Sequence, residues 1–176
     1  EAYGETAPAA ALPAISTLAD MANVLRFRTF SKAYGLAGQR VGYVFGTEDS
    51  VAMFHRVRNH FGVNRLGQAA ALAALKDQDW LAHVLAQVSA SRDRIAAIAE
   101  GHGFKPIASA TNFVTVDCGR DAAYAKAILD GLVSRGVFIR MPGVAPLNRC
   151  IRISTGPEPE IGLFETALAE VVAELG

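Results

Sequence analysis

Apolar residues recur along this chain at two different spacings, and the spacing changes from one segment to the next. Short runs rich in β-branched and aromatic residues have the pattern of strands. These runs occupy residues 23–30, 41–46, 111–116, 137–140 and 150–154. Longer segments repeat apolar residues every three or four positions, which is the spacing of one helix face. We predict helices over residues 64–75, 79–101, 121–135 and from 157–159 to 175.

Signals at the ends of these segments support the helices. Glu48 and Asp49 are typical of a first helical turn, and apolar residues follow them at helical spacing. Asp79 is predicted to cap the long helix, with Trp80 on its apolar face, and Gly136 to close the helix over 121–135. Strands and helices alternate, so the predicted class is α/β, with an α+β arrangement in the later part.

The pattern changes near residues 76–79, where we expect a boundary between two domains, residues 1–76 and 77–176. Residues 1–76 contain too few strands for a complete doubly wound sheet. We therefore expect the chain to be the later part of a larger protein whose N-terminal part is missing.

Composition narrows the classes of function. The chain has 176 residues, 51% of them hydrophobic, which is enough for a sizeable core. Lys and Arg balance Asp and Glu at 17 each, so no overall field favours nucleic acid or an acidic membrane. No apolar stretch is long enough to span a membrane, and we expect no targeting leader. Cys118 and Cys150 lack a CxxC spacing and the four histidines lack ligand spacing, so we expect reduced structural thiols, a cytoplasmic location and no metal.

Candidate chemistry gathers in residues 29–43, with the sequence TFSKAYGLAGQRVGY. Lys32 ends a strand and is followed by a turn containing Gly35 and Gly38, and Arg40 comes eight residues after Lys32. An amine can condense with an aldehyde, and a guanidinium binds phosphate through paired donors. Pyridoxal phosphate (PLP) carries both groups. The alternative is that Lys32 and Arg40 are ordinary surface residues.

This segment resembles the cofactor-lysine segment of the fold-type I PLP-dependent aminotransferases, and its wording is most similar to the histidinol-phosphate aminotransferase branch. The resemblance implies that Lys32 forms the Schiff base with PLP and later moves a proton. It implies that Arg40 holds the cofactor phosphate, together with the hydroxyls of Thr29 and Ser31. It spans essentially the whole chain, so residues 1–76 would be the C-terminal part of the large PLP-binding domain and residues 77–176 the small α+β domain.

The opening EAYGE resembles a second family segment, in which an aspartate before the Glu-Ala-Tyr sequence pairs with the pyridine nitrogen. The resemblance implies that the Tyr3 hydroxyl meets the ring oxygen of PLP, and it places the aspartate just before Glu1. A packing role for Tyr3 is the alternative.

Two late arginines complete the candidate site. Arg140 and Arg152 lie on predicted strands and can point into one cleft from adjacent strands, or else be solvated edge arginines. The segment CIRISTG resembles the family segment whose arginine, here Arg152, binds the substrate α-carboxylate. Arg140 falls where histidinol-phosphate aminotransferases have a second arginine, and the resemblance implies that it binds the substrate phosphate. Asn112 matches an asparagine on the small-domain side of the cleft, although a capping or turn role is equally open.

The resemblance implies a homodimeric aminotransferase that acts on a small amino acid, or an amino-alcohol phosphate, and a 2-oxo acid. Two alternatives remain: a PLP enzyme like the threonine-phosphate decarboxylases, or a non-catalytic fragment that acts as an interaction module. We expect neither nucleic acid nor membrane as a partner.

Overall fold

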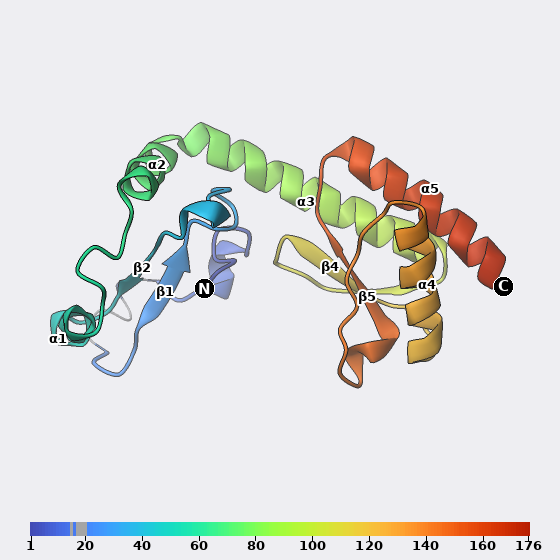
Figure 1. Cartoon of the computed structure of the whole chain (residues 1–176), viewed down its shortest axis with the longest axis horizontal. Coiled ribbons are helices and arrows are strands. Elements are labelled where there is room, and N and C mark those ends of the chain that lie inside the picture. The colour runs from blue at the N-terminus through green and yellow to red at the C-terminus, as the bar shows by residue number, and fades with distance from the viewer. Residues whose placement is uncertain (15, 17–20) are drawn as a thin grey trace. The chain divides into compact units, whose positions relative to one another are not determined.

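The chain divides into two compact units, Glu1–Leu85 and Ala86–Gly176 (Figure 1). The computed structural model describes residues 1–14, 16 and 21–176. The boundary between the units lies within helix α3 (Gln78–Gly101), nine residues beyond the boundary that we expected from the sequence. The assignment of a large and a small domain to these units stays a prediction.

Unit 1 is built around a two-stranded antiparallel sheet. Strand β1 (Arg26–Thr29) pairs with β2 (Gly42–Phe45), with Arg26 opposite Phe45 and Thr29 opposite Gly42. The other elements are η1 (Ala9–Ala11), η3 (Ala37–Gln39), α1 (Glu48–Ala52), η4 (Met53–Arg56) and α2 (Arg65–Lys76). Phe30, Val41 and Ala71 form its small core, so α2 packs against the segment that joins the two strands.

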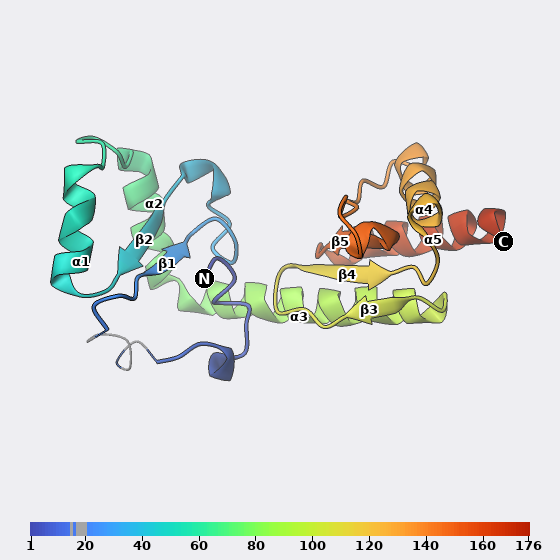
Figure 2. The ribbon, with the colours of Figure 1, turned by 90° about the horizontal axis from the view of Figure 1, so that it is seen from below.

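Unit 2 contains a three-stranded antiparallel sheet in the order β3-β4-β5 (Figure 2). Its elements after α3 are β3 (Lys105–Ile107), β4 (Phe113–Asp117), α4 (Ala122–Ser134), η5 (Leu147–Arg149), β5 (Cys150–Ser154) and α5 (Glu158–Leu175). Val114 and Val116 of β4 and Ile151 and Ile153 of β5 are buried, and they share one core with residues of α3, α4 and α5. The three helices therefore cover one face of the sheet, and the other face carries the polar residues.

Most predicted elements are present, and three details are wrong. Residues 137–140 do not form a strand, because the N–H of Val137 donates to the Leu132 carbonyl (2.9 Å) and closes α4 in a Schellman motif with Gly136 at φ 77°. Asp77 rather than Asp79 caps α3, since its Oδ1 accepts from the Trp80 N–H at 3.0 Å. The Trp80 side chain is 62% exposed and stacks on His83, so it does not belong to a buried face.

Strand β3 has no counterpart in the sequence prediction. It contains Pro106, which has no N–H to donate and argues against a strand in a sequence. The proline is tolerated because β3 lies at the edge of the sheet, where one side of the strand needs no partner.

Among the described helices, none is long and apolar enough to cross a membrane. Within the same residues, no three His, Cys, Asp or Glu side chains lie close enough together to hold a metal ion. Cys118 and Cys150 are free and buried, and burial raises the pKa of Cys118 to about 12.

Candidate functional site

Lys32 lies in a tight turn directly after β1. The Gly35 N–H donates to the Lys32 carbonyl (2.9 Å), and Gly35 adopts a φ of 69°, which a side chain would disfavour. The Lys32 side chain is half-buried, and its Nζ lies 5.2 Å from the centre of the Tyr3 ring. Within the described part of the chain, Lys32 has no carboxylate within ion-pair distance. The structure thus brings together two predicted site residues that are 29 positions apart.

Thr29 and Ser31 form a pair of hydroxyls beside Lys32. The Thr29 hydroxyl donates to Ser31 Oγ at 2.8 Å, and the Ser31 N–H donates to Thr29 Oγ1 at 3.1 Å. This second bond is a local side-chain turn that fixes both hydroxyls relative to the end of β1. Two hydroxyls and a half-buried amine therefore share one short segment.

Arg40 stands in the left-handed backbone region, at φ 55° and ψ 44°. This conformation is uncommon for a residue with a side chain, and surrounding contacts must hold it. Asn64 supplies one of them, because its Nδ2 donates to the carbonyl of Gln39 (2.9 Å) while its Oδ1 caps α2 through the Gly67 N–H. The exposed Arg40 guanidinium donates to the Ala37 carbonyl and, among the described residues, pairs with no carboxylate. It is available for an anion.

The segment that carries Tyr3 is fastened to β1 by ion pairs that the sequence reasoning missed. Glu1 pairs with Arg26 and Arg28, and Glu5 pairs with Arg28 at 2.9 Å. Burial works to raise the pKa of Glu1, but hydrogen bonds from Arg26 and Arg28 outweigh it, so the pKa is lowered. The available sequence signal is one of spacing: two arginines at i and i+2 on a strand face and two glutamates at i and i+4 nearby.

Arg140 and Arg152 lie directly opposite each other in unit 2. Their backbones exchange two hydrogen bonds, at 3.1 Å and 2.7 Å, in an isolated antiparallel bridge. Residues paired in this way project to the same face of a sheet, and their assignment to substrate binding stays a prediction. The guanidinium of Arg152 also lies over the ring of Phe113, 4.6 Å from its centre. Neither arginine is in an ion pair with a described residue, so two positive charges stand side by side without neutralisation.

Asn112 precedes β4, and its backbone carbonyl contacts the segment after β5. It accepts from the N–H (2.9 Å) and the hydroxyl (3.1 Å) of Thr155. These bonds hold the segment that follows β5 and Arg152. The structure therefore gives Asn112 a long-range backbone contact, and both its proposed substrate contact and the alternative capping or turn role stay predictions.

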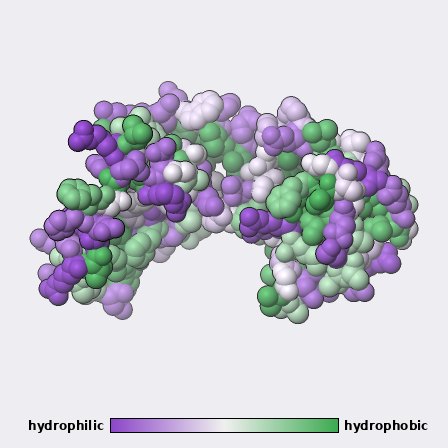
Figure 3. Space-filling model, in the orientation of Figure 1, coloured by the Kyte–Doolittle hydropathy of each residue, from purple (hydrophilic) through white to green (hydrophobic). Residues whose placement is uncertain are grey.

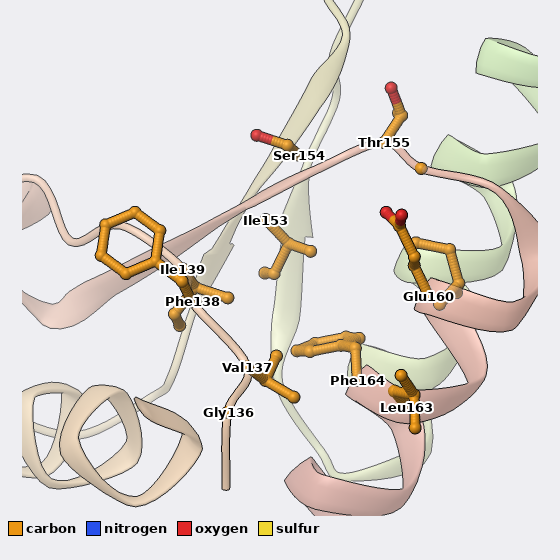
Figure 4. Close-up of a pocket in the computed structure, with 12 residues that line it drawn as sticks. Gly136, Val137, Phe138, Ile139, Ile153, Ser154, Thr155, Glu160, Leu163 and Phe164 are labelled. Carbon is orange, nitrogen blue, oxygen red and sulfur yellow. The ribbon is translucent and has the colours of Figure 1, made fainter. Parts of the chain in front are cut away.

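A separate pocket of about 260 Å³ opens in unit 2 between residues 136–139, the end of β5 and the start of α5 (Figure 4). Phe138, Ile139, Leu163 and Phe164 give it an apolar lining, and Glu160 is its one charged residue. None of the predicted site residues lines it. Because it has a carboxylate and no cation, it does not suit an anionic group such as phosphate.

The profile of the family "Aminotransferase class I and II" matches residues 1–168, and the chain belongs to this family. The predicted family is therefore confirmed.

Individual relatives give a finer comparison. The chain is 40% identical over 173 residues to histidinol-phosphate aminotransferase 2 of Methylococcus capsulatus and 35% identical to histidinol-phosphate aminotransferase of Bacillus subtilis. Both matches cover 98% of this chain, but only 46% and 47% of those proteins. The chain thus spans about half the length of the curated relatives that it matches.

Solved structures agree with the sequence comparison. The crystal structure of histidinol-phosphate aminotransferase from Sinorhizobium meliloti, in complex with pyridoxal-5'-phosphate, matches the whole chain with a TM-score of 0.96 and 59% identity. The chain covers 48% of that structure. L-threonine-O-3-phosphate decarboxylase from Porphyromonas gingivalis matches with a TM-score of 0.78 at 20% identity, which shows a shared fold only. The predicted fold class is confirmed.

Proposed function

We propose that the protein of which this chain forms part is a PLP-dependent aminotransferase similar to histidinol-phosphate aminotransferase. It would transfer an amino group between an amino acid, or an amino-alcohol phosphate, and a 2-oxo acid. The observation that carries the proposal is the turn after β1, where the Lys32 amine lies over the Tyr3 ring beside the Thr29 and Ser31 hydroxyls. The names of the similar proteins support the same function.

The residues present fit PLP. The half-buried Lys32 amine and two adjacent hydroxyls match the aldehyde and the phosphate of that cofactor, as does the Arg40 guanidinium, which pairs with no carboxylate among the described residues. When bound, PLP supplies an electron sink that stabilises negative charge at the substrate Cα. Lys32 would hold the cofactor covalently and take the proton from the substrate Cα. Arg40, Thr29 and Ser31 would bind the phosphate, and the Tyr3 hydroxyl would donate to the ring oxygen.

The substrate would be bound by residues of unit 2. A guanidinium and a carboxylate form a planar, two-bond pair that fixes the orientation of an amino acid, and Arg152 would supply it. Arg140 stands opposite Arg152 on the same face, which suits a second anionic group such as the phosphate of histidinol phosphate. Asn112 would contact the substrate from the start of β4. We also propose a cytoplasmic homodimer, in keeping with two buried free thiols and with exposed apolar side chains on unit 1.

The proposal is tested on the full-length protein with histidinol phosphate and a 2-oxo acid. We expect the amino group to appear on the acceptor and one oxo product to form per amino group transferred. Release of CO₂ from a phosphorylated amino acid without amino transfer would point instead to a decarboxylase. A protein that neither binds PLP nor turns over would favour the remaining alternative, a non-catalytic fragment that acts as an interaction module.

A further inference from the structure

A compact turn carries Tyr3, and its own hydrogen bonds give it one shape. The Tyr3 carbonyl accepts from the N–H groups of Thr6 (3.2 Å) and Ala7 (3.1 Å) and from the Thr6 hydroxyl (3.0 Å). The Gly4 N–H donates to the Glu1 carbonyl at 3.1 Å. The turn is therefore a small rigid piece whose position depends on what fastens it to the rest of unit 1.

Arg28 fastens this turn at both ends. Its Nε donates to Glu1 Oε2 (2.8 Å), and its Nη1 donates to Glu5 Oε1 (2.9 Å). The guanidinium lies close against Gly4, where an added Cβ would come within 2.8 Å of Arg28 Cζ. The Arg28 side chain thus bridges Glu1 and Glu5, on either side of Tyr3, and lies against the backbone of Gly4 between them.

The two ends do not depend on Arg28 equally. Glu1 also pairs with Arg26, whose side chain is only 5% exposed and also donates to the Pro13 carbonyl. The other oxygen of Glu5, Oε2, is buried and accepts no hydrogen bond from a described residue. Loss of Arg28 would therefore leave Glu1 held and would release the Glu5 end, with a shielded carboxylate left unpaired.

Arg28 also stands on the strand that leads to the reactive lysine. It is the residue before Thr29, the last residue of β1, and Lys32 follows three positions after Thr29. Lys32 and Tyr3 are therefore connected in two short steps. Lys32 lies in the turn after β1, and Arg28 of β1 holds the turn of Tyr3 through Glu1 and Glu5, so that Lys32 Nζ lies over the Tyr3 ring.

We propose that Arg28 is a positioning residue that holds the Tyr3 hydroxyl in place for the cofactor through Glu1 and Glu5. This inference rests on the proposed function, since Tyr3 acts there on the ring oxygen of PLP. Arg28 touches neither substrate nor cofactor in this assignment and works through Tyr3 alone.

The experiment uses the full-length protein with the variants Arg28→Met, Tyr3→Phe and the double variant. Arg135→Met is the matched control, because Arg135 also bridges two glutamates, Glu170 and Glu174, and is similarly shielded (24% exposed against 17% for Arg28). The first measurement, on protein freed of PLP, is hydrogen exchange at the amides of Thr6 and Ala7. The second is the pH titration of the absorbance of the PLP-loaded protein.

We expect Arg28→Met to speed exchange at Thr6 and Ala7 by about tenfold or more, and Arg135→Met to leave it unchanged. A hydrogen bond donated to the ionised ring oxygen favours the form of the bound cofactor that carries fewer protons. Its loss in Tyr3→Phe should raise the titration midpoint by about one pH unit. Arg28→Met should shift the midpoint in the same direction, and the double variant should shift it no further than Tyr3→Phe does.

An unchanged midpoint in a folded Arg28→Met protein, or shifts that add in the double variant, would overturn the inference. If Arg28→Met fails to fold, Glu5→Gln makes a milder change at the same anchor and should give a smaller shift of the same sign. An unmoved midpoint there also overturns the inference. A parent protein without bound PLP refutes the proposed function itself, whereas a fully active parent with an unmoved Arg28→Met midpoint refutes only the role of Arg28.

Discussion

Arg140 and Arg152 place two like charges directly opposite each other, an arrangement that destabilises a sheet unless something compensates. The ring of Phe113 stabilises the Arg152 guanidinium in part, through its negative face. No carboxylate among the described residues completes the neutralisation. An anionic ligand would do so, which is the physical reason to assign this pair to substrate binding.

The first prediction separates the roles of these two arginines in the full-length enzyme. Arg152→Lys should lower kcat/KM for every substrate that has an α-carboxylate, because a point charge cannot reproduce the planar fork. The loss should correspond to about 2–5 kcal/mol of transition-state stabilisation. Arg140→Ala should penalise histidinol phosphate far more than an unphosphorylated aromatic amino acid. Steady-state kinetics with both substrates is the measurement. Equal losses on the two substrates would mean that Arg140 does not recognise the phosphate.

At the residue scale, the sequence predicted a chemical role for certain side chains but missed the side chains that hold them. Lys32 and Arg40 were predicted because an amine and a guanidinium on a glycine turn suit an aldehyde and a phosphate, and because residues 29–43 resemble the cofactor-lysine segment of the family. Arg28 and Asn64 were missed, because their partners, Glu5 and Gln39, are more than 20 positions away and the spacing of the charged residues does not by itself show which ones pair. The roles assigned to the eight predicted site residues stay predictions.

The Asn64 side chain links helix α2 to the turn of Arg40, and this contact gives the second prediction. Asn64→Ala removes the cap of α2, at a cost of about 0.5–2 kcal/mol of stability, and frees the Gln39 carbonyl beside the strained Arg40 backbone. We expect weaker PLP binding as well as lower stability, measured by cofactor titration and denaturant unfolding. Asp121→Ala, which removes the corresponding cap of α4, is the control. It should lower stability without affecting PLP affinity, and an equal loss of affinity would contradict the account.

The attachment of the N-terminal turn to β1 gives the third prediction, on pH. The pKa of Glu1 is lowered below its ordinary value of 4.5. A group with a lowered folded-state pKa stabilises the fold above its unfolded pKa, and that contribution disappears as the pH falls through the folded value. The free energy of unfolding should therefore be lower in Glu1→Gln than in the parent at neutral pH. In pH-dependent denaturation, the unfolding free energies of the two proteins should converge as the pH falls below about 4.5 and through the folded-state pKa of Glu1. A difference that stays constant down to low pH would show that the ion pairs of Glu1 contribute nothing.

Elements with strong local signals were predictable, and those that depend on distant partners were not. The helices α2, α4 and α5 match their predicted ranges closely, since apolar spacing and end signals agree. Residues 137–140 have strand composition, but the Schellman motif after α4 uses the first of their N–H groups. Only Arg140 then reaches β5 as a bridge. Strand β3 was missed because Pro106 argues against a strand in the sequence, and only the sheet order shows that β3 is an edge strand.

At the scale of the whole chain, large apolar side chains lie at the surface of both units (Figure 3). Phe61 is 96% exposed, and Val57, Leu66, Phe138 and Val144 are more than three-quarters exposed. Patches of this kind favour association in water. Our fourth prediction is that the 176-residue chain expressed alone self-associates or aggregates. Sedimentation velocity is the measurement, and a stable monomer at micromolar concentration that shows full aminotransferase turnover would contradict it.

The central claim is that Lys32 is the residue that binds PLP, and borohydride reduction tests it most directly. The full-length protein is loaded with PLP, reduced, digested and mapped by mass spectrometry. The account predicts a pyridoxyl adduct on Lys32 in the parent and no adduct at that position in a folded Lys32→Ala protein, which should also lose transamination by orders of magnitude. An adduct on Lys76, Lys105 or Lys126 instead, or no adduct on any lysine, would contradict the account.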